Sequence, residues 1–198
     1  MTTIIFESHA ASVDTEPGVA SGYRDVPLSP HGEQEARALG ERYAPSRVDA
    51  VFCSDLRRAY ETAEIAFAAR GIPIIRDRRL REQDYGEFTG RMRREIGAER
   101  PRRITEPFPG GESVAQAVEH VRLFLRDVAT RHAGETILVI GHSATHFGLE
   151  HWINGTPLHE IVAAPWTYEP GRPYVLTEDA LRRIEDTAQG GYRDRGTP

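Results

Sequence analysis

Short apolar runs alternate along this chain with longer segments whose apolar residues recur at helical spacing. The strand-like runs lie at Thr3–Phe6, Asp49–Ser54, Ile72–Ile75 and in the stretch ETILVIG that ends at Gly141. Strands that are joined through helices pair in parallel and bury both of their faces. The alternation therefore predicts an α/β fold in three layers, a sandwich with a mainly parallel central sheet and helices on both faces.

Helix start and stop signals support this reading. Ser29 is the expected N-cap of a helix that has Pro30 in its first turn. The helix after the second strand is expected to end at Gly71. Ser113 and Gln116 have the spacing of a capping box at the start of a long helix.

Two regions are harder to assign. Residues 81–112 form a Gly- and Pro-bearing connection, with a short helix predicted near Met92–Ala98. The second is the tail PYVLTEDALRRIED, in which TEDALRRIED forms a helix capped by Thr177 or two short strands are joined around Glu178 to Ala180. We expect a single domain over residues 1–198, with a loose C-terminal tail from about residue 187.

Length and composition narrow the class of protein. At 198 residues and 39% hydrophobic content, the chain suits one α/β domain, and its net charge of −5 gives no basic footprint for nucleic acid. No apolar run approaches the ~20 residues of a membrane span, and the N-terminus lacks the pattern of a signal peptide. Cys53 is the only cysteine, which rules out an intrachain disulfide. We therefore expect a cytoplasmic protein with no nucleic-acid or membrane partner.

The basic residues are all arginines, because the sequence contains no lysine. A GC-rich genome explains this most simply. The clusters at residues 76–82 and 91–103 interleave acids with bases, which is typical of solvated surfaces. The same clusters could instead rim a pocket for anionic substrates.

Polar side chains follow three of the predicted strands. Ser8 and His9 end the first run, Arg58 lies just after the second, and His142 and Ser143 follow the last. Ligands of open α/β sheets bind at the carboxyl ends of the strands. Two histidines and an arginine are therefore expected to converge on one small volume.

The blocks around these residues resemble a known family. SHAAS, residues 8–12, stands where that family has Arg-His-Gly-Glu-Thr after its first strand. CSDLRRAYETA matches its Ser-x-x-x-Arg-Ala-x-x-Thr-Ala block, LREQDYGEFTG its Leu-x-Glu-x-x-x-Gly-x-x-x-Gly block, and ILVIGHSATH its second-histidine block. From about Ile4 to Gly155 the chain resembles the histidine phosphatase superfamily, which has the phosphoglycerate-mutase-like fold.

The resemblance implies a two-step transfer without a cofactor or a metal. His9 would attack phosphorus, and Glu82 would protonate the leaving oxygen before water hydrolyses the phosphohistidine. Arg58 would bind phosphate oxygens as a bidentate fork. His142, when protonated, would neutralise charge in the transition state. Without the motif, Glu82 would be interpreted as a surface carboxylate paired with a neighbouring arginine.

Secondary contacts to the phosphate are less specific. Ser12, Thr15 and Ser143 could bind phosphate oxygens, although Ser and Thr also cap turns. His146 lies one helical turn after His142 and could line the pocket, although packing is the commoner role. A metal held by these two histidines and His9 has little support from ligand spacing.

The departure from the family pattern is Ser8, which stands where the motif has arginine. A hydrogen bond to a charged group is worth ~1.5–3 kcal/mol, so its loss would weaken binding of the transferring phosphoryl group. Arg24, in the following loop, is the predicted substitute. The alternatives are a slow or altered enzyme, and a fold retained for binding.

The expected function is hydrolysis of a small phosphorylated metabolite. The alternatives are a non-catalytic protein that binds a phosphorylated ligand, a phosphoglycerate-mutase-type phosphotransferase, and a recruited isomerase or lyase. Mutases carry longer insertions over the site, whereas only about thirty residues separate Glu82 from the GGES block here. The aromatic residues Phe88, Phe108, Trp166 and Tyr168 could contact the substrate, with core packing expected for at least two of them. A homodimer would form through the sheet edge.

Overall fold

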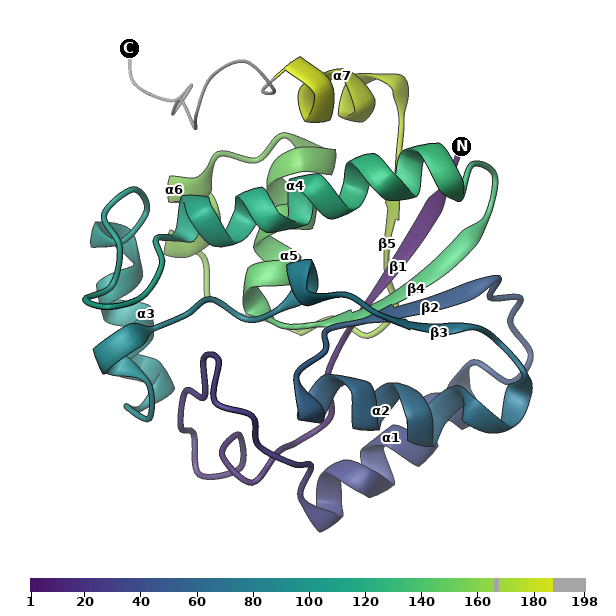
Figure 1. Ribbon diagram of the computed structural model, residues 1–198, viewed down its shortest axis with the longest axis horizontal. Helices are drawn as coiled ribbons and strands as arrows, with labels where there is room; N and C mark the ends of the chain where they lie inside the picture. Colours follow the sequence, from purple (N-terminus) through teal and green to yellow (C-terminus); the bar gives the residue numbers. More distant parts are fainter. Residues whose placement is uncertain (166–167, 187–198) are drawn as a thin grey trace.

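The computed structural model describes residues 1–165 and 168–186, and a five-stranded sheet forms its centre (Figure 1). The strands are β1 (Thr3–Ser8), β2 (Ala50–Cys53), β3 (Ile74–Arg76), β4 (Thr136–Gly141) and β5 (Arg172–Val175). Their order across the sheet is β3-β2-β4-β1-β5. The pairs β3-β2, β2-β4 and β4-β1 are parallel, and the edge strand β5 runs antiparallel to β1. The predicted mainly parallel sheet is confirmed. β5 coincides with the first of the two short strands considered for the tail, but its place beside β1 was not predicted.

Helices cover both faces of this sheet. They are α1 (Pro30–Arg42), α2 (Arg57–Phe67), α3 (Arg93–Glu99), α4 (Val114–Arg131), α5 (Ser143–Leu149), α6 (Leu158–Ala163) and α7 (Glu178–Asp186). Figure 1 shows α1 and α2 below the sheet and α4 and α5 above it. The three-layer α/β architecture is therefore confirmed.

The two faces of the sheet bury different residues, because side chains alternate along a strand. Ile137 and Val139 of β4 pack in one core cluster with the apolar stripe of α4. Leu138 and Ile140 of the same strand pack in a second cluster with residues of α1 and α2. β4 is thus buried on both faces and forms the centre of the molecule.

Several predicted helix ends are confirmed. The hydroxyl oxygen of Ser29 accepts a hydrogen bond of 3.0 Å from the backbone of Gly32. Gly71 ends the turn after α2 with φ +67°, a left-handed conformation that favours glycine. Ser113 and Gln116 form the expected capping box. Thr177 caps α7, so the helical alternative for the tail is correct.

The connection between β3 and α4 folds into a small unit of its own. Tyr85, Ile96 and Phe108 are buried together, and Phe88 packs against them. The predicted short helix is α3. Phe88 and Phe108, which were considered for substrate contact, therefore pack in this core. Trp166, considered for the same role, lies outside the described residues.

Backbone hydrogen bonds join α3 to the loop that follows β1. The amide of Arg93 donates to Gly18 over 2.8 Å, and the amide of Ala20 donates to Arg91 over 2.8 Å. These bonds place the start of α3 above the carboxyl ends of the strands, although α3 and the loop after β1 are far apart in sequence.

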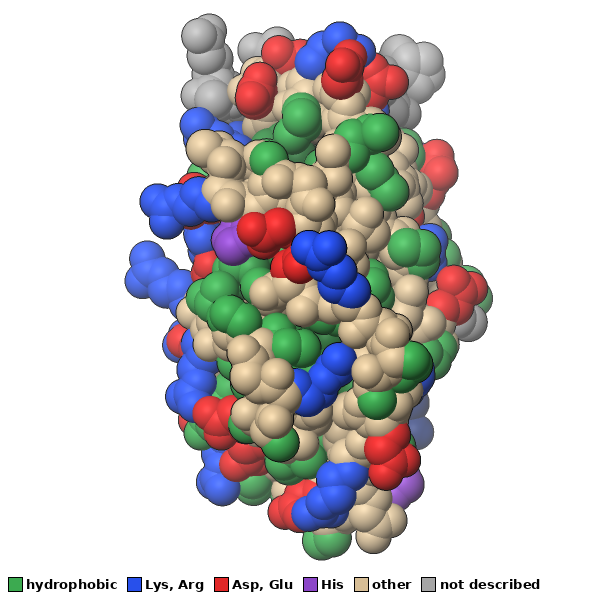
Figure 2. Space-filling model, turned by 90° about the vertical axis from the view of Figure 1, so that its right-hand side faces the viewer, with side chains coloured by type: hydrophobic (Ala, Val, Ile, Leu, Met, Phe, Trp, Pro, Cys, Tyr) green, Lys and Arg blue, Asp and Glu red, His purple; other side chains and the backbone are tan. Residues whose placement is uncertain are grey.

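Acidic and basic side chains alternate over the face seen in Figure 2. Many of the arginines pair with neighbouring carboxylates, as Arg81 does with Asp55 and Arg79 with Asp77. The solvated-surface interpretation is therefore correct for the first arginine cluster. Within the described ranges, no helix has the length and apolar content needed to cross a membrane.

Candidate active site

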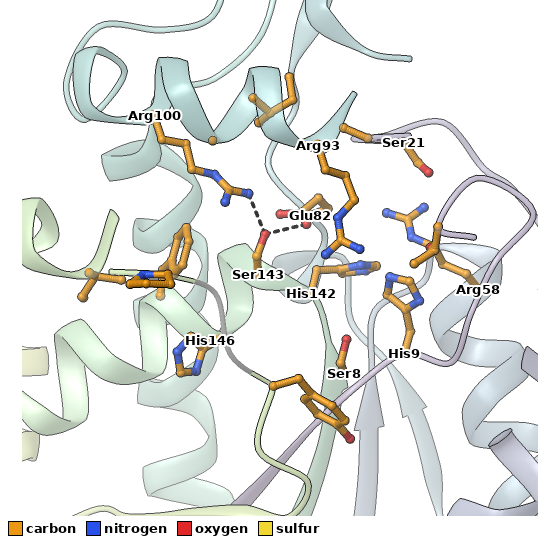
Figure 3. A pocket seen from close by; sticks show the side chains of 18 of the residues that line it. Ser8, His9, Ser21, Arg58, Glu82, Arg93, Arg100, His142, Ser143 and His146 are labelled. Atoms are coloured by element: carbon orange, nitrogen blue, oxygen red, sulfur yellow. Dashed lines mark hydrogen bonds between the residues drawn. The ribbon is translucent and has the colours of Figure 1, made fainter. Parts of the chain in front are cut away.

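His9 and His142 leave adjacent parallel strands side by side. β1 and β4 pair with Ser8 opposite Gly141, so the next residue of each strand emerges at the same edge of the sheet. The amide of His9 donates to the Gly141 carbonyl over 3.0 Å. The two imidazole ring centroids lie 4.9 Å apart (Figure 3). The expected meeting of the two histidines is present in the structure.

The tautomer of His9 follows from its hydrogen bond. Its Nδ1 lies 2.7 Å from the carbonyl oxygen of Ala10. A carbonyl oxygen only accepts, so Nδ1 carries the hydrogen and Nε2 carries the lone pair. Burial, with the Arg58 guanidinium nearby, lowers the pKa of His9 to about 3. The imidazole is therefore neutral near pH 7 and has a nucleophilic nitrogen.

His142 is buried more deeply, with 1% of its surface exposed. Neither of its ring nitrogens has a hydrogen-bond partner among the described residues. Burial, Arg58 and His9 together hold the pKa of His142 well below its ordinary value. A buried polar group without a partner is uncommon and costly, so this ring is prepared to contact a ligand.

Arg58 places a buried positive charge beside these rings. Only 2% of its surface is exposed. Its Nη1 donates to the carbonyl oxygen of Arg24 over 3.1 Å, and its Nη2 donates to that of Gly22 over 3.0 Å. Neutral carbonyls orient the guanidinium without neutralising it, so the charge remains available for an anion.

Glu82 lies at the same site and is held by three donors. Its Oε2 accepts a hydrogen bond of 2.8 Å from the Ser143 hydroxyl. Its Oε1 accepts from the backbone amides of Gln83 and Ala144 over 2.9 and 3.1 Å. Arg100 in turn donates to Ser143, as Figure 3 shows. The carboxyl group is therefore fixed in one orientation at the cavity wall.

A cavity of about 1080 Å³ connects these groups. The predicted site residues in its lining are Ser8, His9, Thr15, Arg58, Glu82, His142 and Ser143. A volume of this size exceeds what one phosphate group needs, and it lies just above the range of roughly 300–1,000 Å³ that is typical of small-molecule pockets. The site therefore has room for the organic part of a phosphate ester.

Two predicted residues lie outside the described lining of the cavity. Arg24 pairs with Asp14 and offers only its backbone carbonyl to Arg58, so its guanidinium does not stand in for the missing motif arginine. Ser12 is fully buried, and its hydroxyl lies 2.7 Å from that of Thr15. Ser12 therefore shapes the turn, while Thr15 reaches the cavity.

The cations contributed by α3 and the turn after it belong to the second arginine cluster, for which the sequence offered a pocket rim as the alternative to a solvated surface, and the structure agrees with that alternative. Arg93, Ile96, Gly97 and Arg100 all line the cavity. Their spacing is that of one face of a helix, and this signal could have identified them in the arginine-rich cluster. Arg93 points toward His142 and His9 in Figure 3 and contributes to the low pKa of His9. Its guanidinium has no carboxylate partner among the described residues.

The far end of the cavity is formed by later parts of the chain. His146 and Tyr168 line it. The Nδ1 of His146 lies 3.0 Å from the hydroxyl of Tyr174, and burial lowers the pKa of His146 to about 4. The described residues contain no cluster of three or more side chains suited to hold a metal ion.

Comparisons with known proteins identify the family. The sequence model of the histidine phosphatase superfamily (branch 1) matches residues 4–170. Phosphoserine phosphatase 1 of Hydrogenobacter thermophilus is 31% identical, over 72% of this chain and 72% of its own length. A 2,3-bisphosphoglycerate-dependent phosphoglycerate mutase of Bifidobacterium longum is also 31% identical, over 84% of this chain and 85% of its own length.

Solved structures share the fold. YhfR of Bacillus stearothermophilus superposes with a TM-score of 0.76 at 27% identity, covering 93% of this chain and 100% of that one. A mycobacterial glucosyl-3-phosphoglycerate phosphatase in complex with VO3 has a TM-score of 0.75 at 21% identity, covering 86% and 90%. Together, these matches show that the chain belongs to branch 1 of the histidine phosphatase superfamily.

Proposed function

We propose that this chain is a phosphoric monoester hydrolase that works through a phosphohistidine at His9. The observation that carries the proposal is the pair of neutral imidazoles at the strand ends, flanked by the guanidinium groups of Arg58 and Arg93. A neutral nucleophile beside fixed positive charge suits attack on an anionic phosphate ester.

In the first step, the Nε2 lone pair of His9 forms a bond to phosphorus. The bond between phosphorus and the ester oxygen breaks, and that oxygen takes a proton from the Glu82 carboxyl group. In the second step, water attacks phosphorus and gives a proton to the Glu82 carboxylate. The bond between phosphorus and Nε2 then breaks, which releases inorganic phosphate and regenerates both groups.

Positive charge around the phosphoryl group compensates for the missing motif arginine. Ser8 carries no charge, and Arg24 is engaged with Asp14. Arg93 lines the cavity beside His9 and has no carboxylate partner in the described chain, so we assign it the role of a second phosphate-binding arginine. A charged hydrogen bond of this kind contributes ~1.5–3 kcal/mol. His142 adds an N–H donor to the same oxygens.

The proposed substrate is a small phosphorylated metabolite. The names of the relatives make phosphoserine and phosphoglycerates the first natural esters to test. A mutase would need a bisphosphate primer and would return the phosphoryl group to its product. The short connection between Glu82 and the α4 cap leaves less chain to shield a phosphohistidine from water, which favours hydrolysis.

The test is release of inorganic phosphate by the purified protein from p-nitrophenyl phosphate and phosphoserine between pH 5 and 8. We expect turnover that His9→Ala abolishes and that His31→Ala, at an exposed histidine of α1, leaves unchanged. Activity that depends on a bisphosphate primer would identify a mutase. Tight vanadate binding without turnover of any ester would identify a non-catalytic binding protein.

A further inference from the structure

Arg100 is a cation inside the cavity wall with an unusual set of partners. It lies in the turn Arg100–Arg102 that follows α3. Its Nη2 donates to the hydroxyl oxygens of Ser143 and Tyr85 over 2.9 and 3.0 Å. Its Nε is buried without a hydrogen-bond partner, and no carboxylate in the described chain pairs with it. Burying a guanidinium against neutral hydroxyls, with no carboxylate partner, costs folding free energy.

The hydrogen bonds from Arg100 have only one possible direction. A guanidinium can only donate, so the Ser143 oxygen must accept from Arg100. The hydroxyl hydrogen of Ser143 is then directed to the Oε2 of Glu82, 2.8 Å away. Without Arg100, the Ser143 hydroxyl could rotate and donate elsewhere. The chain Arg100–Ser143–Glu82 therefore fixes an oxygen of the carboxyl group that transfers the proton (Figure 3).

The other carboxyl oxygen is held independently. The backbone amides of Gln83 and Ala144 bind the Oε1 of Glu82. These donors remain when either Ser143 or Arg100 is replaced. Loss of Arg100 should therefore leave Glu82 in the cavity but allow it to turn about the Oε1 contacts.

We infer that Arg100 is a positioning residue, which acts through Ser143 to hold Glu82 in line with the ester oxygen that leaves. The inference depends on the proposed hydrolysis. It concerns proton delivery and not phosphate binding, which distinguishes Arg100 from Arg58 and Arg93.

The distinguishing readout is the dependence on the leaving group. Phenol is a much weaker acid than p-nitrophenol, so the phenolate of phenyl phosphate needs the proton from Glu82 far more than p-nitrophenolate does. The two esters have nearly the same shape. A defect in folding or in phosphate binding would lower turnover of both esters alike, whereas a misplaced proton donor would selectively slow phenyl phosphate.

The experiment measures kcat and KM of the full chain with both esters. Glu82 also acts in the second step, which is the same for both esters, so the comparison uses kcat/KM, which reports the first step alone. For Arg100→Gln we expect kcat/KM on phenyl phosphate to fall by roughly 10- to 100-fold, part of the 10²–10⁴-fold that general acid catalysis supplies. On p-nitrophenyl phosphate we expect a loss below about 3-fold, because that leaving group needs little protonation. Arg100→Lys should recover part of the loss. Arg102→Gln removes an exposed arginine from the same turn and should behave as the native chain.

Ser143→Ala provides a second test if Arg100→Gln does not fold. It should give the same selective loss, and the double variant should be no worse than either single variant, because both residues act through one hydrogen bond. Equal losses on both esters in the Arg100 and Ser143 variants would overturn the inference while leaving the hydrolase proposal intact. A native chain that turns over neither ester would refute both.

Discussion

Acidification should destabilise this protein through His9, and the effect can be isolated by one substitution. In the unfolded chain His9 has an ordinary pKa near 6.5, whereas burial and Arg58 lower it to about 3 in the fold. Below pH 6.5 the unfolded chain therefore binds more protons than the folded one. Stability consequently falls as the pH drops through the window from 6.5 to 3, and it is unaffected by His9 above pH 7.

The magnitude follows from proton linkage. At pH 5 an unfolded histidine gains about 2 kcal/mol from protonation, and the folded His9 gains almost nothing. The free energy of unfolding should therefore drop by about 2 kcal/mol between pH 8 and pH 5 on account of His9 alone. For a chain of this length, that corresponds to roughly 4–8 °C in the midpoint of thermal unfolding.

The assay is thermal or urea unfolding at pH 8 and pH 5 for the native chain, His9→Gln and His31→Gln. His9→Gln removes the titrating group, so its stability should depend less on pH by about 2 kcal/mol. His31, whose side chain is 65% exposed, should give the same slope as the native chain when replaced. Equal slopes for the native chain and His9→Gln would refute the claim that the fold keeps His9 neutral.

Three further predictions test the site and the packing. Arg93→Gln should lower kcat/KM by roughly 10- to 150-fold for every ester, whatever its leaving group. Adding Ser8→Arg to this variant should restore part of the lost kcat/KM. A loss confined to esters with poor leaving groups would contradict the role assigned to Arg93. Gly32→Ala should destabilise the fold by about 1–3 kcal/mol, because a Cβ there would lie 1.8 Å from the Ala11 carbonyl oxygen; an unchanged unfolding midpoint would refute that clash. Leu125→Ala, at a fully buried position, should cost about 2–5 kcal/mol in denaturant unfolding; a smaller loss would mean that the core closes around the gap.

Local signals predicted most of the fold. Periodicity identified four strands and the main helices, and capping residues such as Ser29 and Ser113 marked where helices begin. These signals act within a few residues, so they can be read along the chain. β5 was only one of two alternatives, because Arg172–Val175 is short, and its pairing with β1 was not predicted because it is a contact between distant segments.

The candidate site was likewise predicted in part from local sequence and set in part by contacts between distant segments. The sequence by itself determined that His9, Arg58 and His142 follow parallel strands, and the parallel order of the sheet brings such strand ends to one edge. Only the tertiary structure decided which arginines face the cavity. Arg24 turns to Asp14, whereas Arg93 and Arg100 reach the site because α3 folds back over the strand ends. The helical spacing of Arg93 and Arg100 puts them on one face of a helix, but contacts between segments far apart in the chain bring that face to the strand ends.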